Sequence, residues 1–194
     1  MSDASPRPLT KLVALASSLV VAGIAVVALW NYLGGSGGDD PATRTSVISP
    51  VQDAVRAAAA HSETCGHRLS SIARVNTAQG GDLDARLAET KDCGAIARRL
   101  AVAGYSALDI ATGPDDSPLR AEFLDSAGSL LSIYEMQGDD FDLIQDLLQN
   151  ARADDTPVAS LASDINYTLG NSAPDIAAAE GQLARTQAAY RSGG

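Results

Sequence analysis

Residues that carry chemistry are scarce in this sequence, which has two cysteines and two histidines among 194 residues. It contains no G-x-S-x-G sequence, so a serine hydrolase motif is absent, and a nucleophile–base pair would need one of the two histidines. It has no C-x-x-C-H motif for haem and no D-x-D/N-x-D/N-G loop for calcium. The GGSGG run at 34–38 lacks the G-K-S/T of a phosphate-binding loop. These absences predict a protein that is not an enzyme and that binds no cofactor.

Basic residues are also few. Lysine and arginine together number 14 against 24 aspartates and glutamates, which leaves a net charge of -10. An acidic surface repels phosphate backbones and anionic lipid headgroups, so the sequence excludes nucleic acid as a partner. The alanine-rich, lysine-poor composition favours a bacterial source.

One long apolar run stands out near the N-terminus, at 12–33, and it contains no charged residue. A helix over Leu12–Trp30 spans roughly 29 Å at about 1.5 Å per residue, which matches one hydrocarbon core. Arg7 and Lys11 precede the run, and no basic residue follows it before Arg44. The positive-inside rule therefore predicts a single-pass anchor in the bacterial inner membrane, with residues 1–11 in the cytoplasm. A cleaved signal peptide is the alternative, but its apolar region is usually shorter and ends at a small-x-small site.

Small residues recur every fourth position within this run, at Ala14, Ser18 and Ala22. Such a face lets two membrane helices approach closely, so these residues predict a homo- or hetero-oligomeric contact through the membrane helix. The alternative is that alanine and serine are simply common in membrane spans.

The segment 34–49 is predicted to be a flexible linker because it begins with a glycine/serine-rich stretch. Such a coil holds the following domain within about 20 Å of the membrane. The sequence thus divides into a tail (1–11), a membrane helix (12–33), a linker (34–49) and a periplasmic domain (50–194).

Helical spacing of apolar residues dominates the domain, and no segment alternates as a strand does. Ser49-Pro50, Ser117-Pro118 and Thr156-Pro157 each pair a hydroxyl N-cap with proline at the first helical position. Aromatic residues make up only 4%, so leucine, isoleucine and alanine must form the core. We therefore predict an all-α bundle or stack of about six helices, at 50–78, 83–111, 118–137, 140–152, 157–169 and 174–190.

The segment from Ala127 to Asn150 resembles a tetratricopeptide unit in its Tyr134-x3-Gly138 spacing. Leu100 and Gly104 lie about 34 residues earlier, which is the period of that repeat. The resemblance implies two antiparallel helices that meet at a turn. The segment departs from the repeat in its second helix, where Leu143 and Asn150 replace small residues. An ordinary helical hairpin is the alternative.

All cysteines and histidines fall in one short region, at His61, Cys65, His67 and Cys93. The two cysteines lie about equally far from Gly80, so an antiparallel helix pair with its loop there would bring them face to face. In an oxidising compartment this arrangement predicts a Cys65–Cys93 disulfide, which would stabilise the fold by on the order of 3 kcal/mol. The competing interpretation is a metal site in which His61 and Cys65, four residues apart, are joined by Cys93 and His67.

Two functions follow from these features. The first is a membrane-anchored helical module that binds or scaffolds other envelope proteins, such as an accessory subunit of a membrane or secretion complex. The second is a periplasmic redox or metal-handling protein that uses Cys65 and Cys93 with His61 and His67. A hydrolase would need a carboxylate pair drawn from residues such as Glu122, Glu135 and Glu180.

Overall fold

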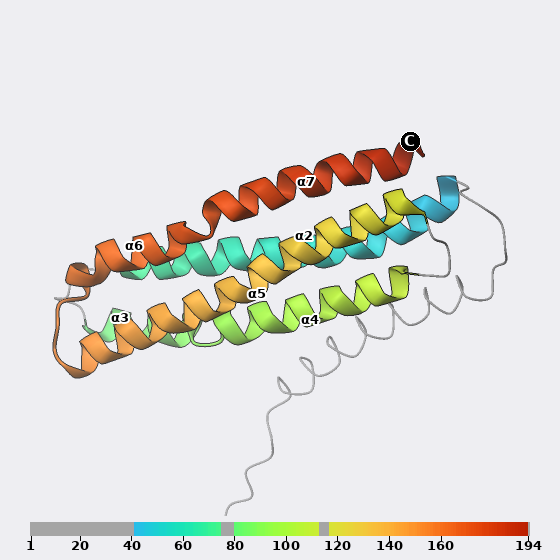
Figure 1. Cartoon of the computed structure of the whole chain (residues 1–194). Helices are drawn as coiled ribbons and strands as arrows, with labels where there is room; N and C mark the ends of the chain where they lie inside the picture. Colours follow the sequence, from blue (N-terminus) through green and yellow to red (C-terminus); the bar gives the residue numbers. More distant parts are fainter. Residues whose placement is uncertain (1–40, 75–79, 113–116, 194) are drawn as a thin grey trace, which may run out of the picture. The chain divides into compact units, whose positions relative to one another are not determined.

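The structure is a computed structural model that describes residues 41–74, 80–112 and 117–193. Every regular element in these ranges is helical, which confirms the all-α prediction (Figure 1). The predicted membrane helix at 12–33, with Ala14, Ser18 and Ala22, lies outside the described residues. Among the helices that are described, none combines the length and the apolar character that a membrane span requires.

Four long helices run side by side in the described part of the chain (Figure 1). They are α2 (Pro41–Ile72), α4 (Cys93–Ala111), α5 (Pro118–Ala153) and α7 (Ala173–Ser192). Helix α5 packs against each of the other three. The shorter elements are α3 (Gly80–Thr90), the 3₁₀ helix η1 (Val158–Leu161) and α6 (Ala162–Asn171).

The core consists of two clusters of buried side chains along the length of α5. One cluster surrounds Phe123, whose ring stacks on that of Tyr190 with 5.8 Å between centroids, and joins α2, α4, α5 and α7. The other surrounds Phe141 and includes Leu69 of α2 and Ile165 of α6. Because few aromatic side chains are available, alanines fill much of the α4 surface, and the helices approach closely there.

The predicted helices 118–137 and 140–152 are one continuous helix, α5. The predicted break between them falls at Gly138, but this residue lies inside α5. A Cβ atom at this position would lie 3.0 Å from the carbonyl oxygen of Gly94 and 3.2 Å from the Cβ of Ala97. The glycine therefore permits close packing of α4 on α5. The turn that the tetratricopeptide resemblance implied within 127–150 is absent from α5, so the paired helices predicted there, whether repeat unit or ordinary hairpin, are wrong.

Helix α2 begins at Pro41, so residues 41–49, predicted to be linker, are helical and Pro50 lies in the helix interior. An interior proline costs one backbone hydrogen bond. Val47 and Ile48, which precede Pro50, are buried in the core, being 8% and 2% exposed. Burial of these side chains offsets the cost of the proline, and the helix extends through it.

The predicted helix 83–111 is divided into α3 and α4 by a turn at residues 91–92. Near this break, Nε2 of Gln145 in α5 donates to the carbonyl oxygen of Leu87 at 3.0 Å. The predicted helix 157–169 likewise starts as η1 and continues as α6, whereas α7 agrees with the predicted helix 174–190 within two residues.

Candidate functional site

Cys65 of α2 and Cys93, the first residue of α4, lie at disulfide distance, with their Cα atoms 5.9 Å apart. Both side chains are buried, at 2% and 3% exposed, within the cluster that surrounds Phe141. The structure therefore brings together the cysteine pair that the spacing about Gly80 predicts. The pair connects α2 to the start of α4.

His61 lies one helical turn before Cys65 and contacts both cysteines. One of its ring nitrogens and the two sulfur atoms all lie within 4.8 Å of one another. Its Nε2 lies 2.8 Å from the backbone carbonyl oxygen of Cys93 and 3.5 Å from the sulfur of Cys65, and its Nδ1 lies 4.0 Å from the same sulfur. A carbonyl oxygen can only accept a hydrogen bond, so Nε2 carries the proton and Nδ1 keeps its lone pair.

His67, the fourth predicted ligand, is not part of this cluster. It is an exposed residue of α2, while the group that could hold a metal consists of His61, Cys65 and Cys93. Positions 65 and 67 are two residues apart on one helix, and therefore point in different directions. The structure thus assembles three of the four side chains in the predicted Cys2His2 set.

The glycines that follow the two cysteines differ in their surroundings. A Cβ atom at Gly94 would collide with the carbonyl oxygen of Gly138 and the carboxylate of Asp142. A Cβ atom at Gly66 would meet nothing within 4 Å. Of these two glycines, only Gly94 is required for close packing of the backbones, at the point where α4 crosses α5.

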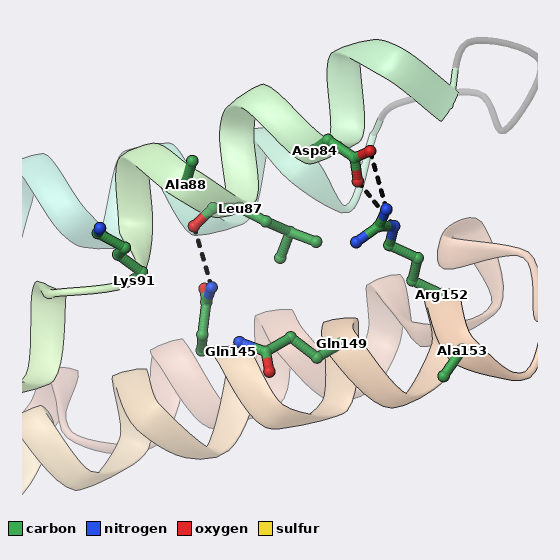
Figure 2. A pocket seen from close by; sticks show the side chains of 8 residues that line it. All are labelled: Asp84, Leu87, Ala88, Lys91, Gln145, Gln149, Arg152 and Ala153. Carbon is green, nitrogen blue, oxygen red and sulfur yellow. Dashed lines mark hydrogen bonds and ion pairs between the residues drawn. The ribbon is translucent and has the colours of Figure 1, made fainter. Parts of the chain in front are cut away.

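An open groove of about 830 Å³ lies between α3 and α5 (Figure 2). At one end Arg152 forms an ion pair with Asp84, with Nε 2.7 Å from Oδ1. Deeper in the groove, the buried Gln145 accepts from the hydroxyl of Thr90 at 2.8 Å and donates to the Leu87 carbonyl. These polar groups are engaged with one another, and the groove lining contains no histidine or cysteine that could act as a nucleophile or base.

Two of the glutamates considered for a hydrolase pair, Glu135 and Glu180, each form a hydrogen bond with a different tyrosine. Glu135 accepts a hydrogen bond from the hydroxyl of Tyr105 on α4, at 2.9 Å. Glu180 accepts from the hydroxyl of Tyr134, at 3.2 Å, across the α5–α7 contact. Burial, followed by the charge of Glu180, raises the pKa of Tyr134, and burial and Glu135 similarly raise the pKa of Tyr105. These two glutamates therefore serve helix–helix contacts.

A row of apolar side chains follows the outer face of α5. Met136 and Leu143 are 58% and 51% exposed, and the partly exposed Ile133 and Leu147 continue the row at helical spacing. We call these four residues the α5 row. Asp140 lies within it, and burial, followed by the charge of Asp139, raises the pKa of that carboxyl.

Comparison with protein-family models, with curated proteins and with solved structures gives no match for this chain. The candidate sites are therefore defined by geometry alone.

The Ile133 end of the α5 row opens into a second groove, of about 420 Å³, between α5 and α7. Its lining combines small apolar side chains, Ala178 and Ala179, with the carboxylates of Asp125 and Asp175. The row and this groove together form an apolar surface with acidic margins.

Sequence reasoning missed the α5 row because it divided this region into two helices, at 118–137 and 140–152. The signal was present in the spacing of Ile133, Met136, Leu143 and Leu147, which share one face only when α5 is read without interruption.

Proposed function

We propose that this protein is a membrane-anchored helical module that binds another envelope protein through the outer face of α5. The α5 row carries this proposal. Met136 and Leu143 expose apolar side chains on one face of α5, and apolar surface gathered on one face is typical of protein–protein contact sites. A role in protein contact, rather than in catalysis, also agrees with Glu135 and Glu180, since each accepts a hydrogen bond from a tyrosine of a neighbouring helix.

The chemistry of this surface favours a basic amphipathic helix as the partner. An apolar stripe at i, i+3 and i+4 spacing accepts the apolar face of another helix. Asp125 and Asp175 line the groove at one end of the row, and the whole chain has a net charge of -10. Lysine or arginine side chains at the edge of a partner helix would complement these carboxylates and make the association sensitive to salt.

Copurification of the full chain from native membranes tests this proposal. The Met136→Ser/Leu143→Ser double variant should lose a partner that the unaltered protein retains. The matched control is Ile110→Ser, which changes a side chain of α4 that is 49% exposed and outside the α5 row. Retention of every copurifying protein by the double variant, or equal loss in the Ile110 control, would contradict the proposal.

The membrane anchor is proposed from the sequence of residues 12–33 and places residues 41–194 outside the cytoplasm. A reporter fused after Gly194 should therefore be active only on the far side of the membrane. Activity of the fusion in the cytoplasm would contradict the anchor, as would a mature protein that lacks residues 1–33.

A second candidate function, in redox or metal chemistry, is favoured by one observation. A ring nitrogen of His61 and the sulfur atoms of Cys65 and Cys93 converge within 4.8 Å. Thiol analysis separates the two candidates, because a disulfide that persists without any bound metal favours the contact module.

A further inference from the structure

We infer that His61, Cys65 and Cys93 form a zinc site when the cysteine pair is reduced. The inference rests on the second candidate function and is independent of the α5 row. Three ligand atoms from two helices already converge within 4.8 Å. Two thiolates and one imidazole are ligands that suit Zn²⁺, and three-ligand zinc sites leave a fourth position for water or another molecule.

The hydrogen bond of His61 prepares its ring for this role. Nε2–H donates to the carbonyl oxygen of Cys93 at 2.8 Å, so Nδ1 is the ring nitrogen whose lone pair is free for an ion. Both nitrogens lie near the sulfur of Cys65, Nε2 at 3.5 Å and Nδ1 at 4.0 Å, so a small turn of the ring brings Nδ1 to the ion. Zinc-binding histidines characteristically donate their other ring N–H to a carboxylate or a backbone carbonyl, which fixes the tautomer and the ring orientation. In this protein the carbonyl belongs to one of the cysteine ligands.

The helical framework, and not the disulfide alone, positions the ligands near one another. His61 and Cys65 are one turn apart on α2, and Cys93 begins α4 with its Cα atom 5.9 Å from that of Cys65. The glycine contacts that bring α4 onto α5 lie next to Cys93, at Gly94. His61 is only partly buried, which gives an ion a route from the surface to the buried sulfur atoms.

The chemical steps require a thiol reductant and Zn²⁺. Two reductant thiols transfer two electrons and two protons to the Cys65–Cys93 disulfide, which yields two cysteine thiols and one reductant disulfide. Zn²⁺ then replaces the two thiol protons, which are released to the solvent. Exchange with a disulfide oxidant takes two electrons from the two thiolates, which restores the Cys65–Cys93 bond, converts the oxidant to two thiolates and releases the ion.

Zinc titration of the full chain in detergent, against a competing chromophoric chelator, tests the inference. The reduced protein should bind one Zn²⁺ per chain and release protons, whereas the oxidised protein should not compete with the chelator. His61→Ala should lower the affinity of the reduced protein by at least about tenfold, since loss of a ligand costs no less than loss of an outer hydrogen-bond partner. His67→Ala is the matched control and should bind like the unaltered protein.

Alkylation provides a second measurement that does not depend on the folding of a variant. Zn²⁺ should protect both cysteines of the reduced, unaltered protein from alkylation. The inference is overturned if the reduced protein does not bind Zn²⁺, if Zn²⁺ leaves the thiols reactive, or if His61→Ala and His67→Ala have equal affinities. None of these outcomes changes the expected result for the α5 row variants, so the two proposals fail separately.

Discussion

Gly94 of α4 and Gly138 of α5 lie backbone against backbone where the two helices cross. A Cβ atom at Gly138 would lie 3.0 Å from the carbonyl oxygen of Gly94, and one at Gly94 would collide with the carbonyl oxygen of Gly138. Arg98, one turn after Gly94, donates to Asp139 at 2.7 Å and to Asp142 at 2.6 Å on either side of the crossing. This contact sets the position of α4 and therefore of Cys93 at its start.

The Gly94→Ala substitution should destabilise the fold, because the added methyl group would clash with the carbonyl oxygen of Gly138 and the carboxylate of Asp142. Overpacking of this kind costs about 1–3 kcal/mol, which should lower the melting temperature by several degrees. Gly66→Ala is the control, since the new methyl group there meets nothing within 4 Å and alanine favours the helix. Circular dichroism during thermal unfolding measures both, and equal melting temperatures for the two variants would contradict the packing role of Gly94.

Removal of the cysteine pair should lower the stability of the folded state. The Cys65→Ala/Cys93→Ala double variant opens a loop with a sequence separation of 28 residues, which should reduce the free energy of unfolding by about 3 kcal/mol. Urea unfolding measures the difference. Intact-mass analysis after alkylation should detect no free thiol in the unaltered protein until a reductant is added, and free thiols before reduction would contradict a formed bond.

Gln145→Ala should loosen α3 more than any other helix. The substitution removes the hydrogen bond from the buried hydroxyl of Thr90 and the one to the carbonyl of Leu87, at a cost of about 1–3 kcal/mol for the two together. Hydrogen exchange should therefore accelerate within Gly80–Thr90. Gln149→Ala changes an exposed side chain of the same groove and serves as the control (Figure 2). Unchanged exchange in α3 of the Gln145 variant would show that the side chain does not hold this helix.

Asp140→Asn should stabilise the domain at neutral pH. Burial, followed by repulsion from Asp139, raises the pKa of this carboxyl above its ordinary value of 3.8. The folded state therefore binds the proton more tightly than the unfolded state, and stability falls as pH rises through the interval between 3.8 and the raised pKa. The asparagine variant has no carboxyl to ionise at this position. Its free energy of unfolding should therefore exceed that of the unaltered protein at neutral pH, and the difference should shrink as the solution is acidified. Urea unfolding at several pH values checks this, with the exposed Asp146→Asn as control.

Much of the architecture could be predicted from local patterns. Helical spacing of apolar residues, with proline after Ser117, identifies the start of α5 because these signals act within one or two turns of chain. The cysteines at positions 65 and 93 could be paired because an antiparallel arrangement about Gly80 places them opposite each other. The position of His61 beside Cys65 could also be predicted, since residues four apart in a helix share a face.

The tertiary structure decided how those local signals were used. Gly138 is compatible with a helix end and with a helix interior, and the approach of α4 through Gly94 selects the interior. Pro50 can begin a helix, but burial of Val47 and Ile48 extends α2 upstream of it. Continuity of α5 then places Met136 and Leu143 on one exposed row, and the carbonyl of Cys93 orients the ring of His61. Each outcome depends on atoms from distant parts of the chain, because packing energy acts between neighbours in space and local sequence specifies only the conformations that a segment can adopt.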